Sequence, residues 1–358
     1  MAIQRVLQIL KDTDATDQHL AALELHHGLT RSGCEVRTLA LGPGKTGQLA
    51  QSVPVIAPSR KSLAAYTQLR AEQRWADGLI LQGVQAAEVA AVIPGALPTA
   101  VGLWSEPADW EGGKRVSLRM AKAMRDGVQL VVTNAAATTS AQRVLDRYRG
   151  STGINSESSG VQLIHTGVRL ANSAKSAALS EASQTARRAA AKQALGLEVS
   201  RLAVRALQSV SVSSRGGNAG SSGGVREAAL SGGAQFVDSL TASSADEELL
   251  LAATDVVIFS DCADGPSVEL LRAMHTGAVA VAADSPAMGE LVEDHVTGRR
   301  FSSVGSADGS LSEVLAELAS NSQQRFALAT AGILRVQAEY SLGQTQAQWL
   351  ATLSSALA

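Results

Sequence analysis

Aromatic residues and cysteines are scarce in this chain of 358 residues. Phe, Trp and Tyr together make up 3% of the sequence, so a platform of rings that stacks bases or sugars is not expected to dominate any site. The two cysteines, Cys34 and Cys262, cannot form a disulfide framework, and the sequence has no zinc-type cluster of Cys and His. The sequence therefore predicts no metal site and no disulfide-stapled fold.

Long apolar runs and a strong net charge are also missing. No stretch reaches the roughly 18 unbroken apolar residues of a membrane span, and the opening MAIQRVLQIL lacks the pattern of a signal peptide. The formal net charge is −2, which argues against bulk electrostatic binding to nucleic acid. We expect a cytoplasmic protein with no membrane span and no nucleic-acid partner.

Short apolar runs alternate with helical patterns along most of the chain. Strands are expected at 5–10, 35–41, 77–83, 99–104 and 127–134, and again at 201–212, 234–240, 255–260 and 278–283. Helices are expected over 17–33, which Gly33 ends, and over the Ala-rich 180–197. Strands that alternate with helices build parallel sheets covered on both faces. The pattern predicts an α/β fold with two Rossmann-like domains.

The length suggests where these domains divide, since 358 residues are long for one hydrophobic core. We expect an N-terminal domain over 1–168 and a C-terminal domain over 169–337. A last helix over 338–358 is expected to pack back toward the first domain through Trp349, Leu350 and Leu353, which share one face.

The segment DCADGPSVELLRAMHTG, residues 261–277, has the features of a site for a diphosphate. It follows the expected strand 255–260, and its Gly-containing loop opens a helix whose free N–H groups and dipole favour an anion. Asp264 can accept hydrogen bonds from sugar hydroxyls. Ser267 is expected near the helix start, because Pro266 cannot lie deep inside the helix. Open α/β sheets bind ligands at the carboxyl ends of their strands, where this loop would lie.

Residues 249–300 resemble the donor-site block of the retaining family 4 glycosyltransferases, which have two Rossmann-like domains facing across a cleft, the GT-B fold. The acidic-Gly loop, the helix with its AM pair, the Glu290-Leu291-Val292 triplet and the Thr297-Gly298 turn fall in register with that family. The resemblance implies retaining transfer of a sugar from a nucleotide-diphosphate sugar to an unknown carbohydrate or lipid-linked acceptor. It implies no metal and no other cofactor. It places Asp264 on the donor sugar and Gly265, Pro266 and Ser267 at the diphosphate.

Three features depart from the family pattern. Arg272 stands where the family has a second carboxylate, and with Glu269 it could read the ribose or form a solvated surface pair. Arg215 alone could replace the cations that the family places at the diphosphate, and the stretch 215–255 is short by roughly one βα unit, so the second domain is predicted to be shortened. In the first domain, Glu106 lies in VGLWSEPADW, where the family has a histidine; Glu106 could bond a hydroxyl.

These departures leave two hypotheses open. One is a retaining glycosyltransferase with weak donor binding and slow or undetectable transfer. The other is a catalytically inactive relative that keeps the fold and binds or scaffolds a protein partner, because fold resemblance alone does not establish activity.

Other polar motifs are given structural interpretations. LGPGKTG at 41–47 lacks the spacing of a phosphate loop and is predicted to be an ordinary loop. His19, His26 and His27 are predicted to be packing or surface residues. Arg187, Arg188 and Lys192 form a basic helical face, predicted to be solvent-exposed or, alternatively, to contact anionic lipid.

Overall fold

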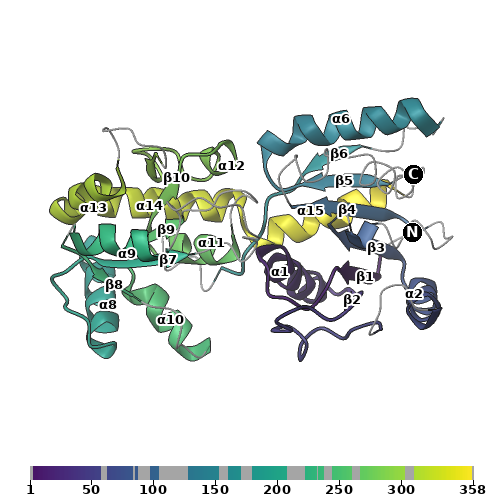
Figure 1. Cartoon of the computed structure of the whole chain (residues 1–358), viewed down its shortest axis with the longest axis horizontal. Coiled ribbons are helices and arrows are strands. Elements are labelled where there is room, and N and C mark those ends of the chain that lie inside the picture. The colour runs from purple at the N-terminus through teal and green to yellow at the C-terminus, as the bar shows by residue number, and fades with distance from the viewer. Residues whose placement is uncertain are drawn as a thin grey trace. The chain divides into compact units, whose positions relative to one another are not determined.

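The structure is a computed structural model with two compact units, each built on a parallel sheet (Figure 1). Unit 1 holds Met1–Gly167 and Leu342–Ala358, and unit 2 holds Val168–Cys262 and Pro266–Ser341. The structure describes residues 3–57, 63–83, 85–87, 97–104, 128–152, 160–170, 180–207, 222–231, 233–237, 244–259, 267–302 and 310–356. The two parallel sheets confirm the predicted α/β class.

The sheet of unit 1 has six parallel strands in the order β2-β1-β3-β4-β5-β6. They are β1 (Arg5–Leu10), β2 (Glu35–Ala40), β3 (Gly78–Gln82), β4 (Thr99–Leu103), β5 (Gln129–Val132) and β6 (Val161–Leu163). The first five lie within the ranges that the apolar runs predicted. Runs such as GLILQ in β3 are buried at every residue, as expected for strands covered on both faces.

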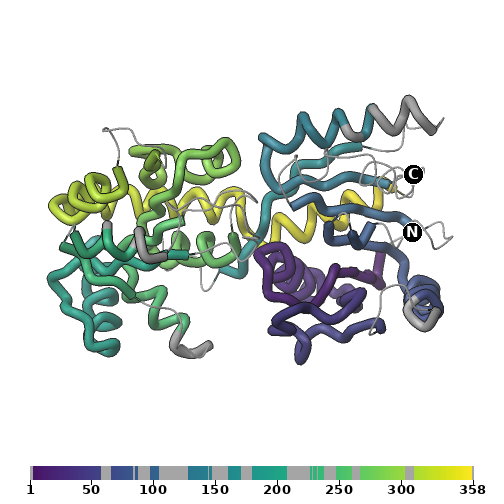
Figure 2. Tube along the Cα trace, in the orientation of Figure 1, coloured from purple at the N-terminus to yellow at the C-terminus, as the bar shows by residue number. Residues whose placement is uncertain are grey.

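Helices cover both faces of this sheet. Alternate strand residues point to opposite faces, so Leu7 and Ile9 pack with α2 (Leu63–Trp75) and α6 (Ala135–Thr152), while Val6 packs with α1 (Asp17–Arg31) and α15 (Leu342–Ser355). The last helix of the chain therefore belongs to the core of unit 1, where Trp349 and Leu353 are buried. Figure 2 shows this yellow segment among the purple and blue elements.

Both ends of α1 are closed by local chemistry. The Thr16 hydroxyl at the N-cap accepts a hydrogen bond from the His19 N–H at 3.3 Å, which satisfies one of the donors that a helix start leaves free. Gly33 follows the C-cap with a φ of 93°, a left-handed conformation that glycine adopts without steric cost. The predicted helix end at Gly33 is confirmed.

The sheet of unit 2 has five parallel strands in the order β11-β10-β9-β7-β8. They are β7 (Ala203–Leu207), β8 (Gln235–Phe236), β9 (Val256–Phe259), β10 (Val279–Ala283) and β11 (Gly298–Phe301). The region between β7 and β9 includes α9 (Ser222–Ser231), β8 and α10 (Ser244–Ala253), and β8 is only two residues long.

Helices also cover both faces of the second sheet. Val204, Val256 and Val279 pack on one face with α9 and α13 (Leu311–Ser320), and Ala203 packs on the other with α10. The other helices of this unit in the described ranges are α8 (Glu181–Ala194), α11 (Val268–His275), α12 (Pro286–Gly289) and α14 (Ser322–Glu339). Within the described part of the chain, no helix combines the length and the apolar character needed to cross a membrane.

Candidate functional site

The helix α11 begins after the carboxyl end of β9, at the edge of the sheet where open α/β folds bind ligands. Ser267 is its N-cap and is 3% exposed. The Ser267 hydroxyl accepts a hydrogen bond from the Leu270 N–H at 3.1 Å, so it lies at the helix start that the sequence predicted. The other first-turn N–H groups of such a helix have no intrahelical acceptor, and with the helix dipole they favour an anion.

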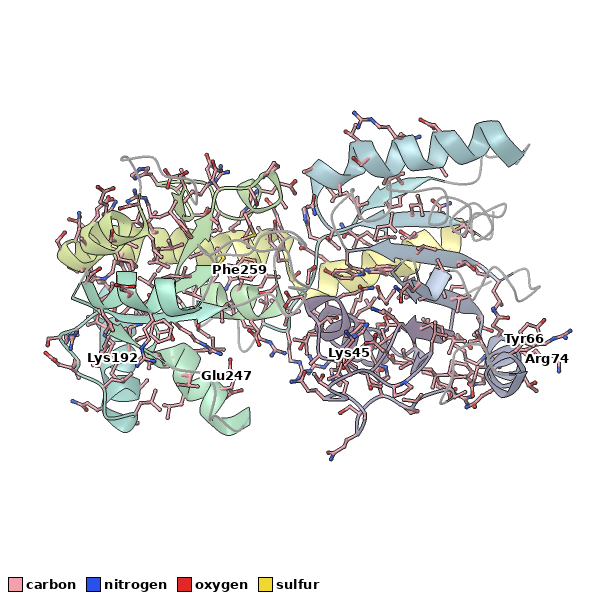
Figure 3. The ribbon with its side chains drawn as sticks, in the orientation of Figure 1. Lys45, Tyr66, Arg74, Lys192, Glu247 and Phe259 are labelled. Atoms are coloured by element: carbon pink, nitrogen blue, oxygen red, sulfur yellow. The ribbon has the colours of Figure 1, made fainter. Side chains whose placement is uncertain are left out.

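A network of charged side chains lies beside α11. Arg205, in the middle of β7, donates to both carboxylate oxygens of Glu247 on α10, at 2.8 and 3.1 Å; Figure 3 labels Glu247. Burial raises the pKa of the Glu269 carboxyl on α11, Arg205 and Arg272 offset part of this rise, and Glu247 adds to it. Charged groups from β7, α10 and α11 therefore act together on the Glu269 carboxyl.

Glu269 and Arg272 are both half-buried. The raised pKa of Glu269, caused first by burial, is not the behaviour of a freely solvated carboxylate. The cation that acts most strongly on Glu269 is Arg205, and Arg272 acts less. Glu269 and Arg272 therefore belong to a wider charged network and do not form the isolated, solvated surface pair that was one of the two interpretations of the sequence.

The other predicted site residues lie outside the described part of the chain. These are Asp264, Gly265 and Pro266, which precede α11 in the sequence, Arg215 in the Gly/Ser stretch, and Glu106 in the first half. Their assigned roles stay predictions.

Sequence reasoning missed Arg205. It lies inside the strand AVRAL and is 3% exposed, although arginine is almost never fully buried without a partner. An arginine within an otherwise apolar strand was the available signal. Its partner Glu247 is 42 positions away in the sequence and could not be identified from local spacing.

In unit 1, Trp104 follows β4 and belongs to a buried hydrogen-bond chain. Its Nε1 donates to Gln82 Oε1 at 2.6 Å, and Gln82 Nε2 donates to Gln8 Oε1 at 3.1 Å. Gln8 Nε2 in turn donates to Thr38 Oγ1 at 3.1 Å. These hydrogen bonds join the adjacent strands β2, β1 and β3 and the residue that follows β4, and because buried polar groups need partners, they are a structural feature of this core.

The loop 41–47 is organised by a carboxylate of the protein itself. Asp14 accepts hydrogen bonds from the N–H groups of Lys45, Thr46 and Gly47 and from the Thr46 hydroxyl, at 2.7–3.1 Å. A Cβ at Gly44 would lie 2.1 Å from Asp14 Oδ1, so only glycine fits there. Successive backbone N–H groups can cradle a phosphate, but here they bind Asp14, in agreement with the predicted ordinary loop.

The carboxylate of Asp14 is held ionised by these contacts. Burial acts to raise the pKa of Asp14, but the hydrogen bonds from the Thr46 hydroxyl and the three backbone N–H groups outweigh it and hold the pKa well below its usual value.

The histidines at 19, 26 and 27 do not gather into a ligand set. His19 is buried with Nδ1 at 2.6 Å from the Asp14 carbonyl oxygen, and His26 Nδ1 lies 2.9 Å from Thr38 Oγ1. Across the described ranges, no group of three or more His, Cys, Asp or Glu side chains is arranged to hold a metal ion.

The basic face predicted on the helix 180–197 is only partly exposed. Arg187 is exposed, but Arg188 is half-buried and Lys192 is 4% exposed. The prediction of a solvated face was wrong for Lys192, because its ammonium group lies 2.5 Å from a carboxylate oxygen of the buried Asp255.

Comparison with known proteins identifies the fold. No protein-family model and no curated protein sequence matches the chain. Among solved structures, it is similar to Anabaena HepE in complex with UDP-glucose, with a TM-score of 0.69 and 17% identity over 98% of this chain and 99% of that one.

Two further solved structures are similar to the chain. A glycosyltransferase from Rickettsia africae has a TM-score of 0.67 and 13% identity, over 100% of this chain and 99% of that one. WaaG, a glycosyltransferase involved in lipopolysaccharide biosynthesis, has a TM-score of 0.59 and 13% identity, over 96% and 99%. The chain therefore has the GT-B fold, which confirms the fold predicted from the resemblance.

Proposed function

We propose that the protein is a glycosyltransferase that uses a nucleotide-diphosphate sugar, retains the anomeric configuration and binds its donor weakly. The observation that carries the proposal is the position of α11, whose capped N-terminus follows the carboxyl end of β9 in the second unit of a GT-B fold. HepE, a structure to which the chain is similar over nearly its full length, was solved with UDP-glucose.

The residues of α11 and of the loop before it receive the roles that the family resemblance implies. The first turn of α11, with Ser267, receives the diphosphate, because N–H groups and the helix dipole stabilise negative charge. Asp264 accepts hydrogen bonds from the donor sugar, and Gly265 and Pro266 bring the backbone close to the phosphates. Glu106 remains a proposed contact for a sugar hydroxyl. The proposed acceptor is an unknown carbohydrate or a lipid-linked molecule.

Weak binding is proposed because the described cations near α11 have carboxylate neighbours. Arg205 makes two hydrogen bonds to Glu247, and Arg272 lies within electrostatic reach of Glu269. A free arginine at a diphosphate contributes about 1.5–3 kcal/mol per charge-assisted hydrogen bond. Without one, binding weakens by roughly 10- to 100-fold, and Arg215 is the residue that we propose as the phosphate cation.

A transfer assay with an NMR readout tests the proposal. The protein is incubated with UDP-glucose and a panel of sugar and lipid-linked acceptors, and the anomeric proton of the product is recorded. We expect slow formation of a product with the donor's anomeric configuration. An inverted product would contradict retention.

The alternative is an inactive GT-B protein that binds a protein partner. The pairing of Arg205 with Glu247 favours it, since it reduces affinity for a diphosphate, and the arginine at position 272 favours it because the carboxylate that reads the ribose in the family is missing. Binding of UDP without any release of UDP from UDP-glucose, in the presence of every acceptor, would select this alternative.

A further inference from the structure

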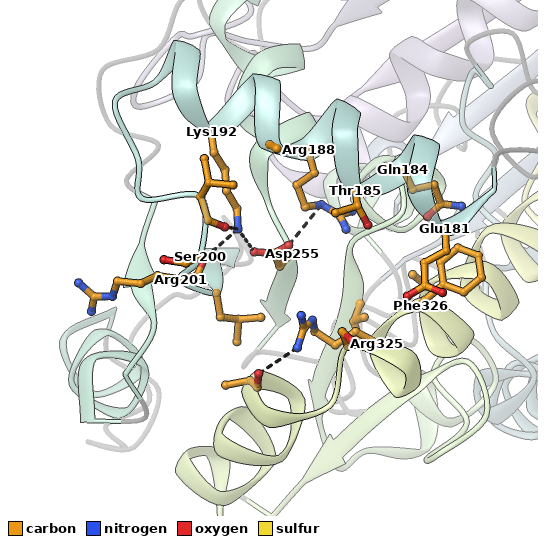
Figure 4. A pocket seen from close by; sticks show the side chains of 17 residues that line it. Glu181, Gln184, Thr185, Arg188, Lys192, Ser200, Arg201, Asp255, Arg325 and Phe326 are labelled. Carbon is orange, nitrogen blue, oxygen red and sulfur yellow. Dashed lines mark hydrogen bonds and ion pairs between the residues drawn. The ribbon is translucent and has the colours of Figure 1, made fainter.

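Unit 2 contains a pocket at the opposite edge of its sheet from the proposed donor site. It lies between α8 and α14, beside the residues that precede or begin β7, β9 and β10, and has a volume of about 160 Å³. Figure 4 shows α8 on one side, α14 on the other and Asp255 between them. We name it the rear pocket; it is lined by Thr185, Arg188, Lys192, Asp255, Arg325 and Phe326, among others. A single water occupies about 30 Å³ of liquid, so the rear pocket has room for a larger group.

Positive charge exceeds negative charge in the rear pocket. Its lining includes four cations, Arg188, Lys192, Arg201 and Arg325, against two carboxylates, Glu181 and Asp255. Arg201 points away from the space in Figure 4 and donates to the backbone carbonyls of Gly233 and Ala234. Without Arg201, the lining has three cations and two carboxylates, and one of these carboxylates, that of Glu181, is exposed to solvent.

The buried carboxylate is shared between two of these cations. Asp255 Oδ2 lies 2.5 Å from Lys192 Nζ and accepts the Ala203 N–H at 2.7 Å, whereas Asp255 Oδ1 lies 3.5 Å from Arg188 Nε. One carboxylate therefore neutralises one cation closely and a second only at a longer distance.

Of the two cations that share Asp255, Arg188 is the less compensated. Its terminal nitrogen donates to the Gly277 carbonyl at 2.7 Å, a neutral partner, and its buried Nε has no hydrogen-bond acceptor. Burial lowers the pKa of Arg188, Asp255 acts against this change, and the positive charges of Arg325 and Arg187 lower it further. A buried cation that neighbouring cations repel is stabilised by an additional anion.

Arg325 approaches the same space from the first turn of α14. It donates to the backbone carbonyls of Leu318 and Ala319 at the end of α13, and neither partner carries a formal charge. Phe326 beside it adds an apolar surface. The first turn of an 18-residue helix adds the positive end of a dipole.

We propose that the rear pocket is a second ligand site that binds a phosphate group, either inorganic phosphate or the phosphate of a small phosphorylated metabolite, between Arg188 and Arg325. The ligand supplies the negative charge that Asp255 and Glu181 do not. Because the rear pocket lies at the amino ends of the strands, this ligand is distinct from the nucleotide donor proposed at the carboxyl ends.

Calorimetric titration of the full chain with inorganic phosphate, and separately with glucose 6-phosphate, tests the proposal. We expect saturable binding of at least one of them, weakened about 10- to 100-fold by Arg325→Gln. Arg187→Gln is the matched control, since it removes the same charge from an exposed position on α8 and should change binding by less than about 3-fold. Tighter binding of glucose 6-phosphate identifies a phosphorylated metabolite, and equal binding identifies phosphate itself.

A second variant tests the charge argument without removing a cation. Thr185 is exposed and lines the rear pocket, so Thr185→Glu supplies the missing negative charge from the protein. It should raise the melting temperature relative to Thr185→Gln and reduce phosphate binding, while UDP binding is unchanged. The proposal is overturned if neither anion binds saturably, or if Arg325→Gln and Arg187→Gln reduce binding equally.

Discussion

Arg205 of β7 and Glu247 of α10 are joined by two hydrogen bonds of 2.8 and 3.1 Å. The Arg205 side chain is 3% exposed and that of Glu247 is 32% exposed, so the pair connects the interior of unit 2 to its surface. Glu269 lies within electrostatic reach of both. Arg205, the most buried cation described near α11, is therefore already hydrogen-bonded to a carboxylate of the protein.

Removing Arg205 should destabilise the protein. Arg205→Met leaves Glu247 without its partner and the half-buried Glu269 without its strongest cation, so the free energy of unfolding should fall by about 1–3 kcal/mol. Urea denaturation measures the change. The expected loss in the free energy of unfolding is smaller than that for a fully buried ion pair, because Glu247 is partly solvated.

The double variant is the control for this prediction. Arg205→Met combined with Glu247→Leu should recover more than half of the lost stability, because an apolar pair leaves no unpaired charge at these positions. Additive losses in the double-mutant cycle would show that the pair is not a coupled unit.

The N-cap of α11 should affect both stability and ligand binding. Ser267→Ala removes the acceptor of the Leu270 N–H and should cost about 1 kcal/mol of stability, and it should weaken UDP binding by about 3- to 10-fold because the first turn of α11 loses its fixed geometry.

Ser310→Ala is the matched comparison for Ser267→Ala. Ser310 forms a capping box with Glu313 at the start of α13. Ser310→Ala should therefore lower the stability by a similar amount without changing UDP binding. Equal effects of the two substitutions on binding would contradict the role of α11 in the site.

The sequence predicted the fold better than the charged sites, for a physical reason. The strands are apolar runs such as VVIF in β9, and the position of such a run can be identified from the sequence without knowing which strand it pairs with. The ion pairs Arg205–Glu247 and Lys192–Asp255 join residues 42 and 63 positions apart, and no local pattern determines them. Lys192 shows the consequence: a basic helical spacing suggested a solvated face, but the buried carboxylate of Asp255, just before β9, pairs with the side chain in the interior.

Capping was predictable because its chemistry is local. Ser267 and Leu270 are three residues apart, and the proline before Ser267 limits where the helix can begin. The Gly-containing loop 41–47 required a partner 31–33 residues away, Asp14, so its spacing could exclude a phosphate loop but could not identify what holds it.

Asp14 should stabilise the protein in a pH-dependent way. Its pKa is lowered in the folded state, so its contribution is fully present above the unfolded value of about 3.9 and is lost as the pH falls through the lower folded value. Asp14→Asn should therefore reduce stability at pH 7, and its difference from the wild type should shrink below about pH 4.

Hydrogen exchange locates this effect. The amides of Lys45, Thr46 and Gly47 should exchange faster in Asp14→Asn than in the wild type, whereas Glu227→Gln, a control at an exposed position on α9, should leave them unchanged. Unchanged protection of these three amides in Asp14→Asn would contradict the assigned role of Asp14.

Restoring a carboxylate at position 272 should help donor binding little. Arg272→Glu removes a cation that offsets the raised pKa of Glu269 and supplies no phosphate cation. We expect the dissociation constant for UDP to change by less than about 3-fold, which corresponds to roughly 0.7 kcal/mol. A tenfold improvement in UDP affinity would mean that ribose recognition, rather than phosphate neutralisation, limits binding.

Calorimetric titration of the purified protein with UDP, GDP and ADP tests the central claim most directly. The account predicts that at least one nucleotide binds saturably, with a dissociation constant in the high-micromolar range or weaker, and that Ser267→Ala weakens it further. Absence of binding by all three at millimolar concentration would contradict a nucleotide-sugar site at α11. A low-micromolar dissociation constant for a nucleotide-diphosphate sugar, abolished by Arg215→Ala, would contradict the weak-binding claim.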